Sequence, residues 1–389
     1  MKKSKLAIVT THPIQYNAPL FRLLSIRGNV NIKVFYTWSQ SAKGAKYDPG
    51  FGKTVDWDIP LLEGYEYSFV ENISTDPGTH HFKGVVNPTL VSEIEAWHPD
   101  AVLVFGWSFK SHLQCLRHFY KKIPVLFRGD STLMDETPGI KQWVRRVFLK
   151  WVYRFVNTAF YVGTQNKWYY LRHGLKEDQL VFAPHAIDNE RFFDKNSEYE
   201  EKSLRWKTEL GISEEGLTFL YAGKLETKKA PESLINAFKS LHLSDAHLIL
   251  VGNGVLEKEL KAKYKDLSSL HFIDFQNQSV MPVIYRLGNV FVLPSSGPGE
   301  TWGLGVNEAM ASGRAVLVSH KCGCAVDLID EGKNGYSFKA GDPVDLPNKM
   351  RTFTQREVNV AAMGEFSAEK IKNWNFNATA AAIESVVVR

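Results

Sequence analysis

The chain has 389 residues, of which 44% are apolar and 23% charged, so it is long enough for two domains with separate cores. Its 47 Lys and Arg residues against 42 acids give a net charge of +5, too weak over this length to indicate a nucleic-acid partner. Three cysteines argue against a disulfide scaffold, and no apolar run reaches the ~18 residues of a transmembrane helix. The first residues lead into a strand rather than a signal peptide, so we expect a cytoplasmic protein.

Residues 1–184 alternate short apolar runs with amphipathic segments, a pattern typical of a parallel sheet wrapped by helices. Seven runs are predicted strands: Leu6–Thr10, Ile32–Tyr36, Tyr67–Val70, Ala101–Phe105, Val125–Arg128, Ala159–Val162 and Leu180–Ala183. In open α/β sheets, ligands bind just beyond the carboxyl ends of the strands. The segments expected at that edge are residues 11–15, 106–108, 128–130 and 163–164.

Four side chains at these strand ends are candidates for chemistry. His12, in a loop limited by proline, is either an acceptor or diphosphate contact or a turn histidine bonded to backbone. Arg128 and Asp130 could stabilise a leaving phosphate and position an acceptor hydroxyl. Trp107 could stack on an acceptor sugar, although most tryptophans simply pack in cores.

Residues 140–158 are predicted to form a helix, with apolar side chains at helical spacing and five cations between them. A basic amphipathic helix can lie on an anionic membrane. The same apolar stripe would also serve a helix that covers a sheet, with its cations in solvent. The sequence leaves both interpretations open.

The predicted second domain covers residues 185–369 and begins within the junction at residues 183–188. Its first strand ends at Gly223, and Lys224 and Lys229 follow on the loop before a helix that starts at Pro231. Two ammonium groups there could neutralise a diphosphate, or they could be solvated loop lysines. A second strand ends at Gly252, and a third ends near Phe275 and Gln276.

The stretch from Gly299 to Gly313 follows a further predicted strand and reads as a glycine-rich loop that enters a helix at residues 306–312. Unpaired N–H groups at the start of a helix attract a phosphate, and Gly303 and Gly305 leave room for its approach. Glu300 and Glu308 lie eight positions apart, and carboxylates beside an anion site are best used on neutral hydroxyls. The pattern indicates a nucleotide sugar, with Glu300 at the sugar and Glu308 at the ribose. The plainer interpretation is a solvated loop acid and a favourable helix N-terminal charge.

Glu300, the Gly303-Leu304 pair, the run Glu308-Ala309-Met310-Ala311 and Gly313 together resemble the E-x7-E signature of the retaining glycosyltransferases of family 4. The resemblance implies a GT-B fold, in which two Rossmann-like domains face each other across a cleft and the last helix, here about residues 370–389, crosses back to the first domain. It implies that the second domain holds the donor, through Gly223, Lys224, Lys229, Gly252, Phe275, Gln276, Glu300, Trp302, Gly303, Leu304 and Glu308.

The chain departs from the family pattern at several of these positions. Lys224 stands where Arg is usual, Ala230 where Gly is usual, and Trp302 where Phe is commoner. The first domain lacks a histidine often found near residues 128–130. The Cys322-Gly323-Cys324 run replaces a Gly-Gly pair, and we expect its cysteines to be small buried side chains rather than zinc ligands.

We therefore predict a retaining, metal-independent hexosyltransferase that uses no cofactor and needs no protein nucleophile. Glu300, Lys224, Lys229, Arg128, Asp130 and His12 are its candidate catalytic residues, with Trp107 on the acceptor side. The expected partners are a nucleotide-sugar donor and a sugar, lipid-linked sugar or small-molecule acceptor in bacterial envelope synthesis, with the protein in the cytoplasm or peripheral at the inner face of the plasma membrane. The alternatives are an inactive donor-binding subunit and a GT-B sugar-nucleotide epimerase.

Overall fold

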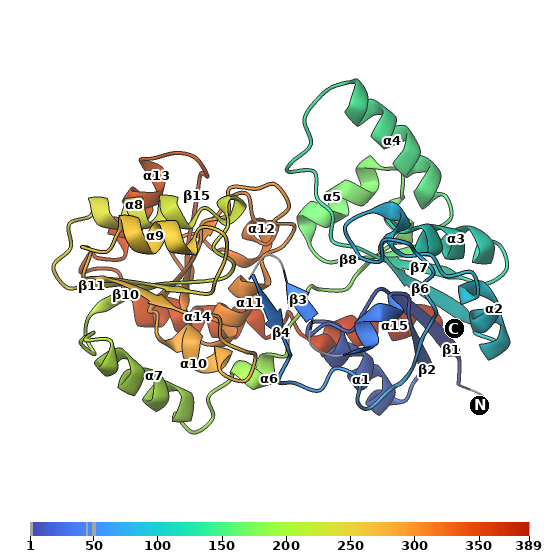
Figure 1. The fold of residues 1–389 in the computed structure, drawn as a ribbon, viewed down its shortest axis with the longest axis horizontal. Coiled ribbons are helices and arrows are strands. Elements are labelled where there is room, and N and C mark those ends of the chain that lie inside the picture. Colours follow the sequence, from blue (N-terminus) through green and yellow to red (C-terminus); the bar gives the residue numbers. More distant parts are fainter. Residues whose placement is uncertain (1–2, 44–45, 49–51, 389) are drawn as a thin grey trace. The chain divides into compact units, whose positions relative to one another are not determined.

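The computed structural model describes residues 3–43, 46–48 and 52–388, and the chain divides into two compact units. The first unit comprises residues 1–46, 59–185 and 376–389, and the second comprises residues 47–58 and 186–375. Figure 1 shows the elements of both units in chain colours, with the red C-terminal helix among the blue and green elements of the first unit.

The first unit is built on a seven-stranded parallel sheet with the strand order β5-β2-β1-β6-β7-β8-β9. The strands are β1 Lys5–Thr10, β2 Asn31–Tyr36, β5 Glu66–Phe69, β6 Ala101–Phe105, β7 Val125–Arg128, β8 Thr158–Tyr161 and β9 Leu180–Phe182. All seven predicted strands are present, each within one residue of its expected bounds. Their near-continuous apolar sequence follows from burial on both faces, which is usual for parallel sheets.

Helices cover both faces of this sheet, and the alternation of β1 shows how. Ala7 and Val9 point into one core, while Leu6 and Ile8 point into the other. The helices are α1 Ala18–Arg27, α2 Leu90–Trp97, α3 Lys110–Phe119, α4 Ile140–Tyr153, α5 Thr164–Arg172 and α15 Phe376–Val387. The predicted helix over residues 140–158 ends at Tyr153, because the chain then turns within four residues to enter β8.

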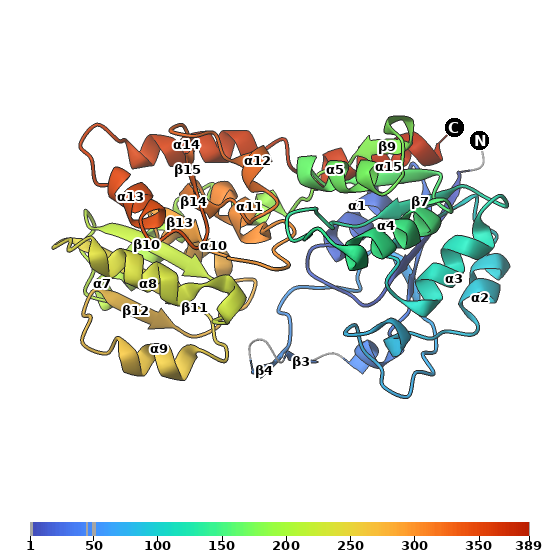
Figure 2. The same cartoon turned by 90° about the horizontal axis from the view of Figure 1, so that it is seen from above.

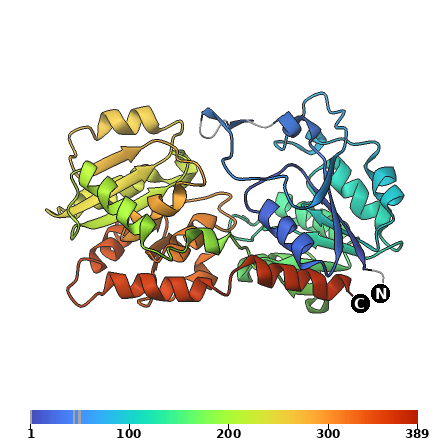
Figure 3. The same cartoon turned by 90° about the horizontal axis from the view of Figure 1, so that it is seen from below.

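The C-terminal helix α15 completes the first unit. Ala380 and Ile383 are fully buried in the same core as Leu6 and Ile8. On its polar side, Glu384 accepts two hydrogen bonds from the Arg27 guanidinium at the end of α1, at 2.7 and 2.9 Å. Figure 3 shows the red helix α15 alongside the blue helix α1. The predicted return of the last helix to the first domain is confirmed.

The second unit contains a six-stranded parallel sheet with the order β12-β11-β10-β13-β14-β15. Its strands are β10 Leu217–Ala222, β11 Ala246–Val251, β12 Leu270–Ile273, β13 Val290–Leu293, β14 Ala315–Ser319 and β15 Gly335–Phe338. Its helices are α6 Asn189–Phe192, α7 Glu198–Glu209, α8 Pro231–Ser240, α9 Glu257–Lys263, α10 Met281–Arg286, α11 Leu304–Ala311, α12 Ala325–Leu328, α13 Asp345–Thr352 and α14 Val360–Ile371. Figure 2 shows α8, α9 and α13 with the sheet strands beside them.

Two segments were not predicted from the sequence. The charged stretch 194–202 runs into α7, and its acids Asp194 and Glu200 pair with the buried Arg286. The short strands β3 Lys46–Asp48 and β4 Lys53–Val55 form a two-stranded sheet that the sequence analysis did not anticipate. Within the described residues, the helices are all too short or too polar to cross a membrane.

Candidate functional site

The site is organised by the point in the second sheet where the strand order reverses. β10 lies between β11 and β13, so the chain leaves the sheet to opposite sides after β10 and after β13. The loop after β10 carries Gly223, Lys224 and Lys229, and the loop after β13 carries Glu300 and Gly303. Residues up to 80 positions apart in the sequence therefore lie at one edge of one sheet.

The strand ends at this edge are packed backbone against backbone. The N–H of Gly223 donates to the carbonyl of Val251 at 2.9 Å, and that of Gly252 donates to Ile273 at 2.9 Å. Gly252 has a φ of +130°, and a Cβ atom there would lie 2.1 Å from the carbonyl oxygen of Gly223. Only glycine fits such a contact, so the strand ends expose main chain where side chains would otherwise stand.

Glu300 is held in place from both loops. Its carboxylate forms a short ion pair with the Lys229 ammonium and accepts a hydrogen bond from the Ser295 hydroxyl at 2.7 Å. The two loops are also joined through main chain, since the N–H of Ser296 donates to the carbonyl of Lys228 at 3.0 Å. Glu300 and Lys229 are half-buried, so solvent and salt screen their attraction less than that of a surface ion pair.

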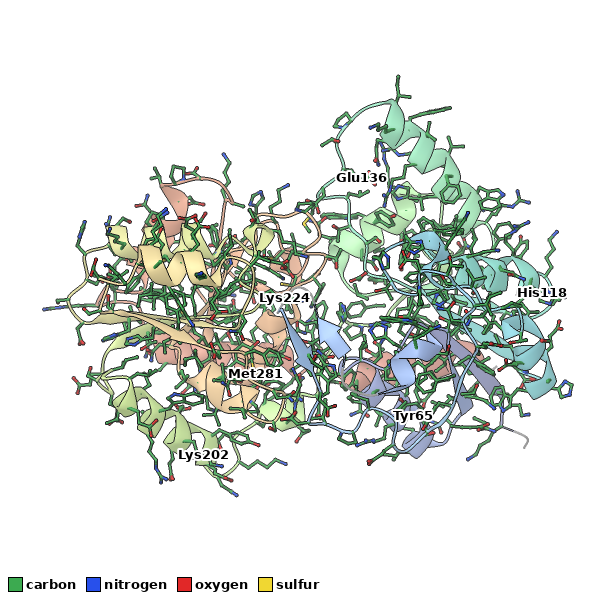
Figure 4. The ribbon with its side chains drawn as sticks, in the orientation of Figure 1. Tyr65, His118, Glu136, Lys202, Lys224 and Met281 are labelled. Carbon is green, nitrogen blue, oxygen red and sulfur yellow. The ribbon has the colours of Figure 1, made fainter. Side chains whose placement is uncertain are left out.

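Lys224 lies on the same loop as Lys229, at the end of β10. Its carbonyl accepts a hydrogen bond from the Tyr221 hydroxyl at 2.7 Å, which fixes the main chain where the strand ends. Burial, with the nearby acids Glu300 and Glu226, raises the pKa of Tyr221 well above its usual range, so this hydroxyl stays protonated and donates. Lys224 is labelled in Figure 4.

The turn Cys322-Gly323-Cys324 fixes the Glu300 loop from behind. The N–H of Gly323 donates to the carbonyl of Glu300 at 3.1 Å, and that of Cys324 donates to Trp302 at 3.0 Å. A Cβ atom on Gly323 would lie 1.8 Å from the carbonyl oxygen of Thr301. Cys322 and Cys324 are buried, as predicted, and both are free thiols. The only sequence signal that this turn fixes the Glu300 loop was Gly323. Its contact with Thr301 is tertiary, so no local sequence pattern reveals it.

Helix α11 begins at Gly303, which has a φ of +100° and serves as its N-cap. A Cβ on Gly303 would lie 2.7 Å from Cδ2 of Leu293, so the helix starts directly against β13. In the part of the chain that the structure describes, no protein acceptor is found for the N–H groups of Gly303, Leu304 and Gly305. Three donors at the positive end of the helix dipole are thus available to an anion.

Glu308 and Trp302 occupy buried positions around this helix. Glu308 is 3% exposed and accepts a hydrogen bond from the Tyr285 hydroxyl at 2.7 Å. The Trp302 indole N–H donates to Asn307 at 2.8 Å, and its ring packs on Trp374 with the centroids 5.1 Å apart. The arrangement around Trp302 favours a packing role for its side chain; donor contact through Trp302 stays a prediction.

Phe275 and Gln276 follow β12 at the same edge. The N–H of Phe275 donates to the Asn253 side chain at 2.9 Å, and the Gln276 amide turns back to the Asp274 carbonyl at 3.1 Å. The ring of Trp57 meets Phe275 edge-on at 6.4 Å, and Asp58 accepts from the Ser279 N–H at 3.2 Å. Residues 56–58 are thus a neighbour of this loop that sequence order did not suggest.

In the first unit, His12 and Trp107 follow β1 and β6, the strands at which that sheet reverses its order. Nδ1 of His12 lies 2.9 Å from the Thr11 hydroxyl, and its ring meets Trp38 edge-on at 5.3 Å. Trp107 is half-buried against the core and meets Phe148 of α4 at 5.4 Å. Contact of His12 and Trp107 with an acceptor stays a prediction.

Arg128 is 7% exposed and holds the last residues before the second unit. Its guanidinium donates to the carbonyls of Ala183 at 2.9 Å and Pro184 at 3.1 Å. Burial lowers the pKa of Arg128 to about 10 and that of the nearby His185 to about 4, the latter helped by the Arg128 charge and opposed by Asp130. These hydrogen bonds give Arg128 a structural role at the end of the first unit. Its contact with a phosphate stays a prediction.

One group of three metal-ligating side chains exists within the described residues. Asp76, His80 and His81 lie on an irregular segment of the first unit, with ligand atoms within 4.8 Å of one another. The Asp76 carboxylate and the His80 Nε2 atom are 3.1 Å apart. This group lies in the first unit, whereas the Glu300 loop lies in the second. That the protein works without a metal stays a prediction.

Comparison with known proteins adds a family to this geometry. The family model described as Glycosyl transferases group 1 matches residues 203–370. The chain is 27% identical over 211 residues to the sulfoquinovosyl transferase SQD2 of Arabidopsis thaliana, a match that covers 54% of this chain and 39% of that relative. The match thus spans about two fifths of that relative's length.

Solved structures share the fold along the whole chain. The Anabaena protein HepE in complex with UDP and glucose superposes with a TM-score of 0.72 at 15% identity, over 99% of this chain and 100% of that one. WaaG, a glycosyltransferase involved in lipopolysaccharide biosynthesis, gives 0.67 at 14% identity, over 98% and 99%. The predicted GT-B fold with two Rossmann-like domains is confirmed, and so is the resemblance carried by the two glutamates. The family likeness by sequence is thus carried by residues 203–370, which match the model of glycosyl transferases group 1 and lie within the second unit.

Proposed function

We propose that this protein is a retaining glycosyltransferase that moves a sugar from a nucleoside-diphosphate sugar to a hydroxyl group. The observation that carries the proposal is the edge of the second sheet, where strands end in glycine, Lys229 of the loop after β10 pairs with Glu300 of the loop after β13, and α11 begins at Gly303. The family of residues 203–370 and the transferase relatives support the same activity.

The diphosphate of the donor would lie on the N–H groups of Gly303 and Leu304. Lys224 and Lys229 would supply the opposite charge, together matching the about two negative charges of a diphosphate. The attraction grows as the bond to the sugar breaks, because charge then accumulates on the departing phosphate. Interactions that strengthen in this way lower the barrier rather than merely tighten binding.

Glu300 and Glu308 would hold the neutral parts of the donor. The Glu300 carboxylate, already fixed by Lys229 and Ser295, would accept hydrogen bonds from sugar hydroxyls. Glu308, fixed by Tyr285, would accept them from the ribose. Lys229 would then touch both the carboxylate beside the sugar and the phosphate that leaves it, so it would link donor binding to bond cleavage.

In the reaction, the bond between the anomeric carbon and the phosphate oxygen breaks as the acceptor oxygen bonds to that carbon from the same face. The proton of the acceptor hydroxyl passes to the departing phosphate oxygen. The configuration at the anomeric carbon is retained without a covalent enzyme intermediate, in contrast with the two carboxylates of a retaining hydrolase. His12, Arg128, Asp130 and Trp107 of the first unit remain candidates for the acceptor side.

The donor is proposed to be a UDP-sugar, since HepE was solved with UDP and glucose. The loop of Phe275 and Gln276 would receive the base. The acceptor is proposed to be a polysaccharide or lipid-linked sugar of a bacterial envelope, with the protein peripheral at the inner face of the plasma membrane; WaaG, involved in lipopolysaccharide biosynthesis, shares the fold.

Two measurements on the full chain test this function. A panel of nucleoside diphosphates and nucleotide sugars is first screened for a rise in melting temperature, which a ligand of the native state produces by mass action. Release of nucleoside diphosphate is then followed with and without candidate acceptors. Release that requires an acceptor supports the transferase. Stabilisation with neither transfer nor hydrolysis, across a broad acceptor panel, would instead favour an inactive donor-binding subunit.

A further inference from the structure

Helix α4, Ile140–Tyr153, carries apolar side chains on two opposite faces. One face, with Leu149, Val152 and Tyr153, is buried in the core of the first unit. A helix of this kind normally presents polar residues on its other side. Here that side is apolar as well, so packing against the sheet explains only half of the pattern.

The outward face is a stripe of Ile140, Val144, Val147 and Trp151, which recur at the i, i+4, i+7 and i+11 spacing of one helix face. The first three are exposed, whereas Trp151, at the end of the stripe, is half-buried against the core of the first unit. Ile140 is 83% exposed and Val147 51%, and Trp143 beside them is 65% exposed. We call these five residues the α4 stripe. Figure 1 shows the first turns of α4 extending beyond the elements that cover the sheet.

Cations border the stripe on both sides. At 100° per residue, Lys141 falls on one side of it and Lys150 on the other, and both are exposed. The helix sequence contains four cations and no acid. Two of these cations also serve the fold: Arg145 donates to the Tyr169 hydroxyl at 3.4 Å, and Arg146 lies 3.9 Å from Glu136, which Figure 4 labels beside α4.

An open hollow of about 700 Å³ adjoins the same face. It lies at Trp151 of the stripe and is lined by Gln114, Arg117, His118, Trp151, Arg154 and Phe155. The guanidinium of Arg117 sits over the Trp151 ring at 5.5 Å, and that of Arg154 over Phe155 at 5.2 Å. Among the neighbouring acids, Glu95 is paired with His118 at 2.7 Å. The hollow thus offers two guanidinium groups on an aromatic floor.

We infer that α4 docks this protein on a bilayer containing anionic phospholipid. The α4 stripe would enter the boundary between headgroups and acyl chains, Lys141 and Lys150 would remain among the headgroups, and Arg117 and Arg154 would receive a phosphate. Apolar side chains flanked by cations on both sides match a surface that is apolar below and anionic at its plane. A symmetric contact with a second copy would instead bring four α4 cations against four, which is unfavourable.

This inference names the surface for the membrane location proposed above, but it does not depend on the donor chemistry. A protein held at the bilayer through α4 would meet an acceptor that is itself anchored there. The lipid experiment below contains no nucleotide, so its failure would leave the transferase proposal standing, and failure of the transferase assay would leave the docking surface standing.

The test is flotation of the full chain with vesicles of pure phosphatidylcholine or pure phosphatidylglycerol. The wild type should float with the anionic vesicles and remain in solution with the neutral ones. Replacing Trp143 and Val147 together by Ser, or Lys141 and Lys150 together by Glu, should each weaken binding by about tenfold or more. All four positions are exposed, so circular dichroism should show that both variants fold.

Matched controls change equally exposed residues of the second unit. Val255→Ser with Val344→Ser, and Lys239→Glu with Lys265→Glu, should leave flotation unchanged. Equal binding to both kinds of vesicle, no binding by the wild type, or unchanged binding by the α4 variants would overturn the inference. A concentration-dependent dimer by light scattering, abolished by the Ser variant while vesicles are not bound, would assign the stripe to a second copy and also overturn it.

Discussion

Lys229 and Glu300 are 71 positions apart in the chain and form one ion pair at the edge of the second sheet. Their candidacy as site residues could be predicted from the sequence, because both lie close to glycines in loops that follow strands, where ligands bind in open α/β sheets. Their pairing could not be read, since it depends on which strands are neighbours. The same limit applies to Arg128, whose bonds to Ala183 and Pro184 depend on where β9 ends.

The first prediction concerns Glu300→Gln. The amide keeps the size of the side chain but loses the charge that pairs with Lys229 and grips sugar hydroxyls, so turnover should fall by about 10²–10³-fold. Binding of UDP, which lacks the sugar, should change little. Steady-state kinetics and calorimetry on the variant measure the two effects separately.

Glu357→Gln, an exposed acid elsewhere in the second unit, is the control and should behave as the wild type. Turnover by Glu300→Gln within a few fold of the wild type would show that the carboxylate is not needed for transfer.

A second prediction at this scale concerns pH and His112 of α3. Its ring is fully buried, donates from Nδ1 toward the carbonyls of Phe105 and Gly106, and receives the Thr37 hydroxyl at Nε2, 2.8 Å away. Burial lowers the pKa of His112 from 6.5 to about 4, with the backbone bonds opposing the shift. Between these values the unfolded chain binds a proton that the folded protein does not, so stability falls as the pH falls.

The histidine should therefore remove up to about 3 kcal/mol of unfolding free energy between pH 6.5 and pH 4. In His112→Gln, urea denaturation across this range should show a shallower loss by about that amount. The same pH dependence in wild type and variant would mean that His112 is already neutral in the unfolded chain or charged in the folded one.

Elements in this molecule are predictable where local sequence decides them. All seven strands of the first sheet are apolar runs bounded by turn residues, and α8 begins at Pro231 as expected. The turn behind the Glu300 loop was not predictable, because Gly323 is required by the carbonyl of Thr301 rather than by its own neighbours. The outward apolar face of α4 was equally hidden: a helical stripe has the same spacing whether it meets a sheet or solvent.

The third prediction tests that turn with Gly323→Ala. A methyl group there would lie 1.8 Å from the Thr301 carbonyl, so either the turn or the Glu300 loop must move. We expect a loss of about 1–3 kcal/mol in unfolding free energy, together with weaker donor binding. Thermal denaturation with and without UDP measures both.

Gly341→Ala is the matched control, since its Cβ would meet nothing within 4 Å although its φ is +78°. It should cost only about 1 kcal/mol and leave UDP binding intact. If both variants bind UDP as the wild type does, the turn does not position the Glu300 loop.

At the scale of the whole molecule, the sequence predicted the two-sheet architecture but not the segment of the first half of the chain that belongs to the second unit. Two sheets, a junction near residue 185 and a last helix on the first unit follow from apolar runs and from the glutamate motif. Residues 47–58 belong to the second unit although the chain on either side belongs to the first. This assignment depends on contacts such as that of Asp58 with Ser279. Contacts of this kind leave no periodic pattern in the sequence.

The central claim is that the edge carrying Lys229 and Glu300 binds the diphosphate of a nucleotide sugar, and two neighbouring lysines allow a direct test. Lys229 pairs with Glu300, whereas the exposed Lys228 pairs with Glu226. Calorimetry of the preferred nucleoside diphosphate with Lys229→Ala and Lys228→Ala measures the contribution of each. The account predicts at least about tenfold weaker binding for Lys229→Ala and nearly unchanged binding for Lys228→Ala. Equal affinities for the wild type and Lys229→Ala, or an equal loss in both variants, would contradict it.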